Sequence, residues 1–377
     1  MAGIADRSKL EELPGELLLR ITEEVGRISQ IYLDPGQDSL VSFHVTSQRL
    51  RDMSRRLLFR GFVVDWDDLI NSSGKHRGLF PSNNSLQAFQ GVPEKVKWTR
   101  SFAFKAGRET RVKGVPVTKQ SIERTGLFLS HMLSTATELS KLTVLLLIAA
   151  KDFSLHNVMR VHGIPALPFV KELAIDLHSG FLLESCPEVT SVTIMGCSRH
   201  GSFYNASNNL LARIANMEKV ETVEHNSTFD ETLLPFPTMS NVRHYKVVGA
   251  LISHHWMRHY ADFATCLPST MPNLVSLTIV IHAHEHAPSR AWKKLGKERI
   301  ARHFTAGFLR EHPKLQKVTI ARILYRDQHM HYPELVDGWE RQRGHGKLED
   351  SPLYKRNELS FGGISYKEWT PTSEGLP

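Results

Sequence analysis

Apolar residues near the start of the chain recur at the spacing of an amphipathic helix. Proline suits the first turn of such a helix because its missing N–H would have no partner there. We therefore expect a helix to begin at Pro14. Its apolar stripe consists of residues separated by four, four, four and three positions, which are Leu13, Leu17, Ile21, Val25 and Ile28.

A second helical pattern follows the chain break at Asp34-Pro-Gly. It begins at Asp38 or Ser39, both good N-caps, and a strand-like stretch around Val63 comes after it. Two or three helices in about fifty residues bury little apolar surface, so such a module is marginal alone. It gains stability by burying a face against a partner, although an ordinary helical cap on the next domain fits the periodicity equally well.

The order of residues in these two helices resembles the F-box. The run L-P-x-E-L-L-x-x-I starting at Leu13 matches its opening, and L-V-S-F-x-V-T-S-Q-R-L-R-x-M starting at Leu40 matches its second half. The ending L-L-F-R is common in fungal members, and the mild departures are Phe43 and Thr46. The resemblance covers about residues 8 to 60. It implies contacts with a Skp-type adaptor, and through it a cullin, by Leu13, Pro14, Leu17, Leu18, Ile21, Leu40 and Val45.

Another pattern recurs along the rest of the chain: a Pro or polar start, then apolar-x-x-apolar-x-apolar. Each unit predicts a short strand with one buried face, and helices are expected between units, at residues 207–217 and 299–311. The intervals between first apolar positions are 31, 19, 31, 22, 32 and 41 residues. Those positions are Leu139, Val170, Val189, Val220, Val242, Leu274 and Leu315.

The unit resembles the core of a leucine-rich repeat of irregular length, such as follows an F-box in many fungal proteins. We therefore predict an α/β chain in which a small all-helical F-box module precedes an irregular leucine-rich-repeat-like solenoid. The alternative is a generic α/β domain with alternating strands and helices. The predicted ranges are 8–62 for the F-box, 63–135 for a connecting region that could hold irregular first repeats, 136–335 for the repeat domain and 336–377 for a polar, partly disordered tail.

The unit also predicts a binding surface, because residues between its apolar positions should face out of the sheet. The row is mixed in charge and rich in hydroxyl groups, so it suits a polar protein segment. We expect Asp176 to lie in this row, and we expect reversal of the charges of Arg243 and Lys246 to leave the fold intact. The candidate target-binding residues are Arg243, Lys246, Ser276, Thr278, Gln316 and Thr319.

Composition narrows the class of protein. Of 377 residues, 41% are hydrophobic and 23% charged, which is typical of folded chains. The net charge of +8 is too modest at this length to favour nucleic acid over an acidic protein. Three cysteines without a CxxC pair predict a reducing compartment. Without an apolar N-terminal region or a long apolar run, we expect no membrane association and a cytoplasmic or nuclear location.

Signs of chemistry are weak, so we expect no enzyme, no cofactor and no metal. The run His282-Ala-His284-Glu285-His286 lacks a second ligand pair at zinc-site spacing. Phosphate-binding and nucleophile-elbow motifs are absent from the sequence. The resemblance thus implies a substrate-receptor subunit of a cullin-based (SCF-type) ubiquitin ligase that binds a protein target. A leucine-rich-repeat scaffold that binds protein or RNA without that role is the alternative.

Overall fold

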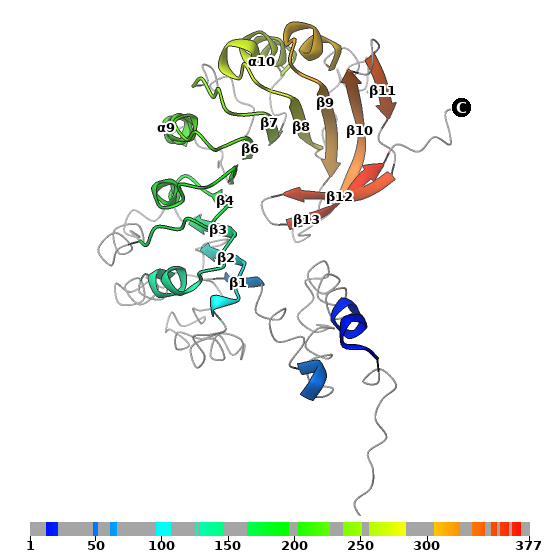
Figure 1. Ribbon diagram of the computed structural model, residues 1–377. Helices are drawn as coiled ribbons and strands as arrows, with labels where there is room; N and C mark the ends of the chain where they lie inside the picture. Colours follow the sequence, from blue (N-terminus) through cyan, green and yellow to red (C-terminus); the bar gives the residue numbers. More distant parts are fainter. Residues whose placement is uncertain are drawn as a thin grey trace, which may run out of the picture. The chain divides into compact units, whose positions relative to one another are not determined.

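The computed structural model describes residues 13–21, 48–51, 61–65, 96–106, 126, 129–146, 164–195, 203–226, 237–250, 256–283, 305–324, 334–343, 348–352, 355–361 and 364–370 (Figure 1). The chain forms two compact units. The first comprises Met1–Phe104, Glu109–Lys141 and Lys151–Pro165, and the second comprises Lys105–Arg108, Leu142–Ala150 and Ala166–Pro377.

The first unit combines short helical segments with two strands. Residues 15–21, 48–51 and 129–135 are helical. Leu18 and Leu50 are fully buried, and Arg49 donates a hydrogen bond to the backbone oxygen of Leu13 at 3.2 Å. The strands are β1 (Gly61–Asp65), at the stretch read as strand-like from the sequence, and β2 (Ser101–Ala106), most of which lies in this unit.

The second unit is built on a mostly parallel sheet whose strands follow one another in chain order from β3 to β11. Strands β4 to β9 pair in parallel, and β10 and β11 continue the sheet antiparallel. A separate antiparallel hairpin joins β12 (Lys355–Phe361) to β13 (Ile364–Thr370). The sheet strands are β3 (Lys141–Leu146), β4 (Glu172–Ile175), β5 (Ser191–Ile194), β6 (Thr222–Asn226), β7 (His244–Ala250), β8 (Ser276–Ala283), β9 (Lys317–Leu324), β10 (Glu334–Arg343) and β11 (Leu348–Pro352).

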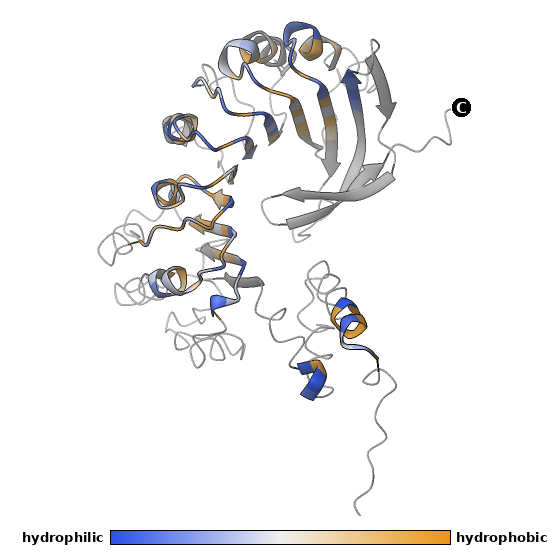
Figure 2. Cartoon of the chain, viewed as in Figure 1, coloured by the Kyte–Doolittle hydropathy of each residue, from blue (hydrophilic) through white to orange (hydrophobic). Residues whose placement is uncertain are grey.

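The parallel register aligns the apolar positions of successive units into two buried rows. Figure 2 shows hydrophobic residues alternating with hydrophilic ones along these strands. One row joins Leu173, Val192, Val223, Tyr245, Leu277 and Val318, and the other joins Ile175, Ile194, His225, Val247, Ile279 and Ile320.

Helices pack on the apolar face of this sheet and complete its core. They are η1 (Gly180–Ser185), α9 (Phe203–Ala215), α10 (Trp256–Thr270) and the helical residues 305–311. The Phe263 ring on α10 lies 6.3 Å from the Tyr245 ring on β7 and 5.9 Å from the Phe308 ring, measured between centroids. The three rings bury one another's apolar surface. Their tilted and edge-on arrangements are ones that aromatic pairs favour.

A tight turn precedes each parallel strand and explains the first apolar position of the unit. The backbone N–H of Val242 donates to the Met239 oxygen at 3.3 Å, and that of Leu274 to the Met271 oxygen at 3.1 Å. The apolar side chain of the turn is buried, as at Val242. The residue after it then accepts two bonds from the next turn. For example, the Arg243 oxygen accepts from Val275 at 2.7 Å and from Ser276 at 3.0 Å.

The predicted fold class is wrong in both of its parts. The described residues of the first 62 show no all-helical F-box module: they comprise two short helical segments, 15–21 and 48–51, and the start of the strand β1. The second unit is an α/β fold with a mostly parallel sheet and antiparallel closing strands, and not a leucine-rich-repeat-like solenoid. The unit pattern specifies a turn and a strand but does not determine how successive units pack together. Its unequal intervals suit the alternative of a generic α/β domain.

The last part of the chain contains strands that its composition did not suggest. Strands β11, β12 and β13 lie within the range 336–377, and β10 runs into it. The composition is polar and rich in Gly, which predicted a partly disordered tail. Polar strands of this kind escape a search for apolar alternation, because neither face carries a continuous apolar row. The ranges 8–62, 63–135, 136–335 and 336–377 stay predictions.

A buried histidine in the second apolar row makes stability depend on pH. Burial lowers the pKa of His225 to about 4 from 6.5, so the folded protein holds it neutral. Below pH 6.5 the histidine binds a proton in the unfolded chain but stays neutral in the folded chain. Proton binding therefore favours the unfolded state, and the free energy of unfolding decreases as the pH falls toward 4. We expect the free energy of unfolding to be lower at pH 5 than at pH 7.5 by about 2 kcal/mol because of this group alone.

Urea unfolding at both pH values checks this expectation. His225→Leu removes the titrating group while keeping an apolar side chain in the row. The difference in unfolding free energy between pH 7.5 and pH 5 should shrink by about 2 kcal/mol in the variant. An equal difference in wild type and variant would contradict the buried neutral state.

Candidate functional site

The face of the sheet opposite the helices carries polar side chains in two rows. The parallel register places Lys246 beside Glu224 on one side and Thr278 on the other. Thr278 is followed by Thr319, and Thr319 by Glu340 of β10. The second row runs through His244, Ser276, Lys317 and Gln342.

The charged groups of this face pair with one another. Lys246 Nζ lies 3.3 Å from Glu224 Oε2, and the two side chains are only 16% and 11% exposed. Lys317 Nζ lies 2.8 Å from Glu340 Oε2, which also accepts a hydrogen bond from Thr319 Oγ1 at 3.1 Å. Because these charges already pair with one another, the face stabilises the sheet more than it offers charge to a ligand.

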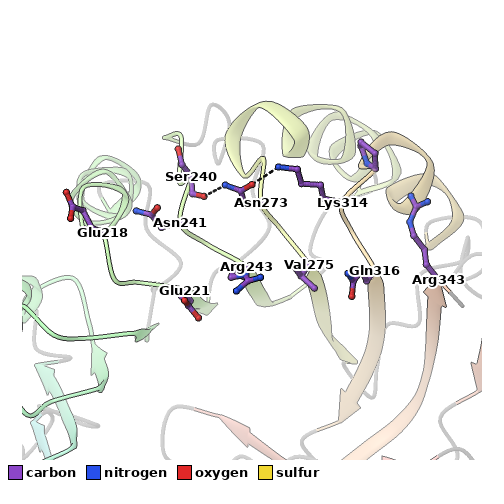
Figure 3. A pocket seen from close by; sticks show the side chains of 11 residues that line it. Glu218, Glu221, Ser240, Asn241, Arg243, Asn273, Val275, Lys314, Gln316 and Arg343 are labelled. Carbon is purple, nitrogen blue, oxygen red and sulfur yellow. Dashed lines mark hydrogen bonds between the residues drawn. The ribbon is translucent and has the colours of Figure 1, made fainter. Parts of the chain in front are cut away.

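A polar groove lies at the edge of the sheet where the parallel strands β6 to β9 begin (Figure 3). Strand β10 runs antiparallel, so its carboxyl end, Arg343, reaches the same edge. The lining residues come mainly from the turns that precede the strands. They are Glu218, Glu221, Ser240, Asn241, Arg243, Asn273, Val275, Pro313, Lys314, Gln316 and Arg343.

The sequence places these side chains through the first apolar position of each unit. That residue is buried in the turn, so the residues on either side of it face outward. Asn241 and Arg243 flank Val242 in this way. Equivalent positions supply Glu221, Asn273, Val275, Lys314 and Gln316.

Hydrogen bonds between successive turns fix the walls of the groove. Asn273 Nδ2 donates to the Ser240 oxygen at 2.7 Å, and Lys314 Nζ donates to Asn273 Oδ1 at 2.7 Å (Figure 3). Arg343 Nε donates to the Leu315 oxygen at 2.7 Å, and its Nη2 donates to the His312 oxygen at 3.3 Å and to the Leu309 oxygen. Arg343 therefore caps the end of the helical residues 305–311.

Three charged groups in the groove have no such partner. Within the described ranges the exposed side chains of Glu218, Glu221 and Arg243 make no hydrogen bond or ion pair. The next turn along the edge differs, because Glu188 pairs with Lys219 and, at 3.5 Å, with Lys171. The hydrogen bond from Lys219 lowers the pKa of Glu188. Among the described residues, the groove thus exposes three charged side chains that no other side chain of the protein neutralises.

The predicted target-binding residues fall on two different surfaces. Lys246, Ser276, Thr278 and Thr319 lie on the self-paired face, whereas Arg243 and Gln316 line the groove. Sequence reasoning missed Glu218, Glu221, Asn273 and Lys314, although their place beside the first apolar residue of a unit would have identified most of them.

Of the predicted adaptor contacts, Leu17 is the most exposed leucine. Its exposed fraction is 46%, while Leu13 and Ile21 are half-buried and Pro14 is exposed. Leu18 is fully buried. Leu40 and Val45 lie outside the described residues.

The expectation that Asp176 faces outward is wrong. Asp176 is buried directly after β4, and its Oδ1 accepts hydrogen bonds from the N–H of His178 at 3.0 Å and from the N–H of Ser179 at 2.8 Å. Ser179 Oγ lies 2.8 Å from the same Oδ1 and 2.6 Å from the Val144 oxygen, and its single proton can be donated to either. Asp176 Oδ2 accepts from the N–H of Leu146. Burial raises the pKa of this carboxyl. The hydrogen bonds lower the same pKa, but the effect of burial is larger.

Other groups that carry chemistry give no site in the described part of the chain. Burial raises the pKa of the Cys186 thiol to about 12, which makes it a poor nucleophile. The described residues include no cluster of His, Cys, Asp or Glu that could hold a metal, and His284 and His286 lie outside them. Among the same residues, no helix has the length and apolar character needed to cross a bilayer.

Comparison with known proteins adds no relative. A scan against protein-family models and a search of curated proteins each found no match to the chain.

Proposed function

We propose that this protein is a receptor that holds a protein target and supplies no bond chemistry itself. The observation that carries the proposal is the edge groove, where Glu218, Glu221 and Arg243 are exposed and unpaired among the described residues. Unpaired charges aligned on a rigid edge suit recognition of another charged surface, because complementary charge gives specificity.

The receptor acts, in this proposal, as the target-binding subunit of a cullin-based ubiquitin ligase. The ordered match to the F-box motif supports this part, and the exposed Leu17 on the helical residues 15–21 is the side chain available for a Skp-type adaptor. Catalysis then depends on proximity and orientation of the bound target. The second candidate is a scaffold that binds protein or RNA without an adaptor, and the free carboxylates Glu218 and Glu221 favour protein over RNA in the groove.

Two substitutions on one helical segment test the adaptor contact. Leu17 and Leu19 are exposed to 46% and 45%, but they lie about 200° apart around the helix. Only Leu17 belongs to the F-box contact set. We expect Leu17→Glu to lower co-purification of the Skp-type adaptor at least tenfold, because it puts a charge into an apolar contact.

Leu19→Glu is the matched control, since it makes the same change at equal exposure. We expect it to leave adaptor binding within about twofold of wild type. Equal losses in the two variants would show that the Leu17 face is not the contact. Absence of adaptor from the wild-type protein would remove the ubiquitin-ligase role and leave the scaffold reading.

A further inference from the structure

The charged groups of the edge groove are segregated along its length. Glu218 and Glu221 come from the turn before β6, whereas Arg243 comes from the turn before β7 and Lys314 from the turn before β9. Figure 3 shows the acidic groups at one end and the basic groups toward the other. Neighbouring strands are about 4.8 Å apart, so β6 to β9 spans about 14 Å.

The groove also offers uncharged groups that suit a polypeptide backbone. The side chains of Asn241 and Gln316 make no hydrogen bond within the part of the chain that the structure describes. Each amide carries both a donor and an acceptor, which is what the N–H and C=O groups of an extended segment need. Val275 is the apolar aliphatic residue of the lining, so a lipid tail would find little contact.

The spacing of the charges sets the spacing expected in a ligand. An extended chain that crosses the strand ends advances about 3.3 Å per residue, so about 14 Å corresponds to about four residues. A basic side chain would pair with Glu218 or Glu221, and an acidic one about four residues on would pair with Lys314, which makes no ion pair within the described residues. Arg243 lies one strand, or about 4.8 Å, from Glu221 and adds positive charge between the two ends. A uniformly acidic ligand such as nucleic acid would meet the two carboxylates and be repelled at that end.

We propose that the groove binds an extended protein segment that carries a basic residue and an acidic residue about four positions apart. This inference rests on the proposed receptor function and names the class of target segment that the receptor selects. The two charges of the segment complement the two ends of the groove, and the backbone between them bonds to Asn241 and Gln316. Segments with two like charges are rejected by the end of the groove that carries the same sign.

Labelled synthetic nonapeptides with a Gly/Ser/Thr background test the proposal on the full chain. The charged pair, four positions apart, is Lys and Glu, Lys and Lys, Glu and Glu, or Gln and Gln. By fluorescence anisotropy we expect wild type to bind the Lys–Glu peptide about tenfold more tightly than either like-charge peptide. Equal affinities, or no binding of any peptide at about 1 mM, would overturn the inference.

Single charge reversals should switch the preference and not merely weaken binding. Glu221→Lys makes the groove mostly basic and is expected to favour the Glu–Glu peptide. Arg243→Glu makes it mostly acidic and is expected to favour the Lys–Lys peptide. Both side chains are exposed and unpaired within the described residues, so the fold should persist, as circular dichroism will report. Unchanged peptide order in both variants would overturn the inference.

A control and a second readout separate this inference from the receptor function. Lys97→Glu reverses an exposed charge in the first unit and should leave the peptide order unchanged. A change of order in this variant equal to that in Arg243→Glu would overturn the assignment to the groove. Adaptor co-purification is measured on the same preparations. Retained adaptor binding without peptide preference removes only the inference, whereas peptide preference without adaptor binding removes only the ubiquitin-ligase role.

Discussion

Lys246→Glu is expected to destabilise the second unit by about 4 kcal/mol, because it removes one half of a largely buried ion pair. Lys246 Nζ lies 3.3 Å from Glu224 Oε2, and neither side chain is more than 16% exposed. The substitution sets two carboxylates side by side on neighbouring strands. Like charges directly opposite each other in a sheet repel, and here little water is present to screen them.

Urea unfolding, with Arg243→Glu as the matched control, measures this cost. The control reverses an exposed charge three residues earlier and should change the free energy of unfolding by less than about 0.5 kcal/mol. The exchanged pair Glu224→Lys with Lys246→Glu should recover part of the loss, because it restores opposite charges in the same register. Equal stability of Lys246→Glu and Arg243→Glu would show that the pair contributes nothing.

Because Lys246 is paired and Arg243 is exposed, the two residues must be substituted separately in a binding experiment. The sequence pattern predicted that Arg243 and Lys246 both point out of the sheet, and that reversing both would leave the fold intact. The structure separates the two residues, since Lys246 pairs with Glu224 and Arg243 lines the groove without a partner within the described residues. Reversing both together would mix loss of stability with loss of binding, so Arg243 must be tested alone.

Periodicity predicted individual elements well but not their assembly. The unit placed β4 to β9 correctly, because alternation with a buried face depends only on local spacing. Helices expected at residues 207–217 and 299–311 correspond to α9 and to the helical residues 305–311. How successive units stack depends on contacts between distant residues, and there the prediction of a solenoid failed.

The site was predicted only in part, because charge pairing is not visible in a single strand. Whether Lys246 or Arg243 is free depends on what the neighbouring strand carries, and this follows from the register of β6 with β7. The groove itself forms from the flanking positions of four separate turns, so each residue gives a weak signal alone. Aligning the units on their first apolar residue would have brought Glu221, Arg243 and Gln316 into one row.

Asp176 shows a signal that was present and overlooked. Alternation along β4 predicts that the residue after Ile175 faces outward, and this holds only while the strand continues. The strand ends there, and the sequence Asp-Leu-His-Ser has the spacing of a turn in which an aspartate accepts hydrogen bonds from N–H groups two and three residues ahead. Asp176 makes these bonds to His178 and Ser179.

Asp176→Ala is expected to destabilise the second unit by about 3 kcal/mol, measured by urea unfolding. The carboxylate is buried and accepts from three backbone N–H groups, those of Leu146, His178 and Ser179. Removing it leaves these donors without their acceptor where water has little access, and an unsatisfied buried donor costs about 1–3 kcal/mol. The Leu146 bond also links β3 to the turn after β4, so its loss weakens the packing of the two strands.

Asp176→Asn separates the loss of acceptors from the loss of charge. Its side-chain oxygen can still accept from His178 and Ser179, but its amide nitrogen then faces the N–H of Leu146, and two donors cannot bond. We therefore expect a loss smaller than that of the alanine variant but above that of an exposed control such as Glu218→Ala, which should stay within about 0.5 kcal/mol of wild type. If the alanine variant were as stable as this control, the turn would be held by its backbone and by Ser179 alone, whose Oγ donates to the Val144 oxygen at 2.6 Å and accepts from the Asp176 N–H at 2.8 Å.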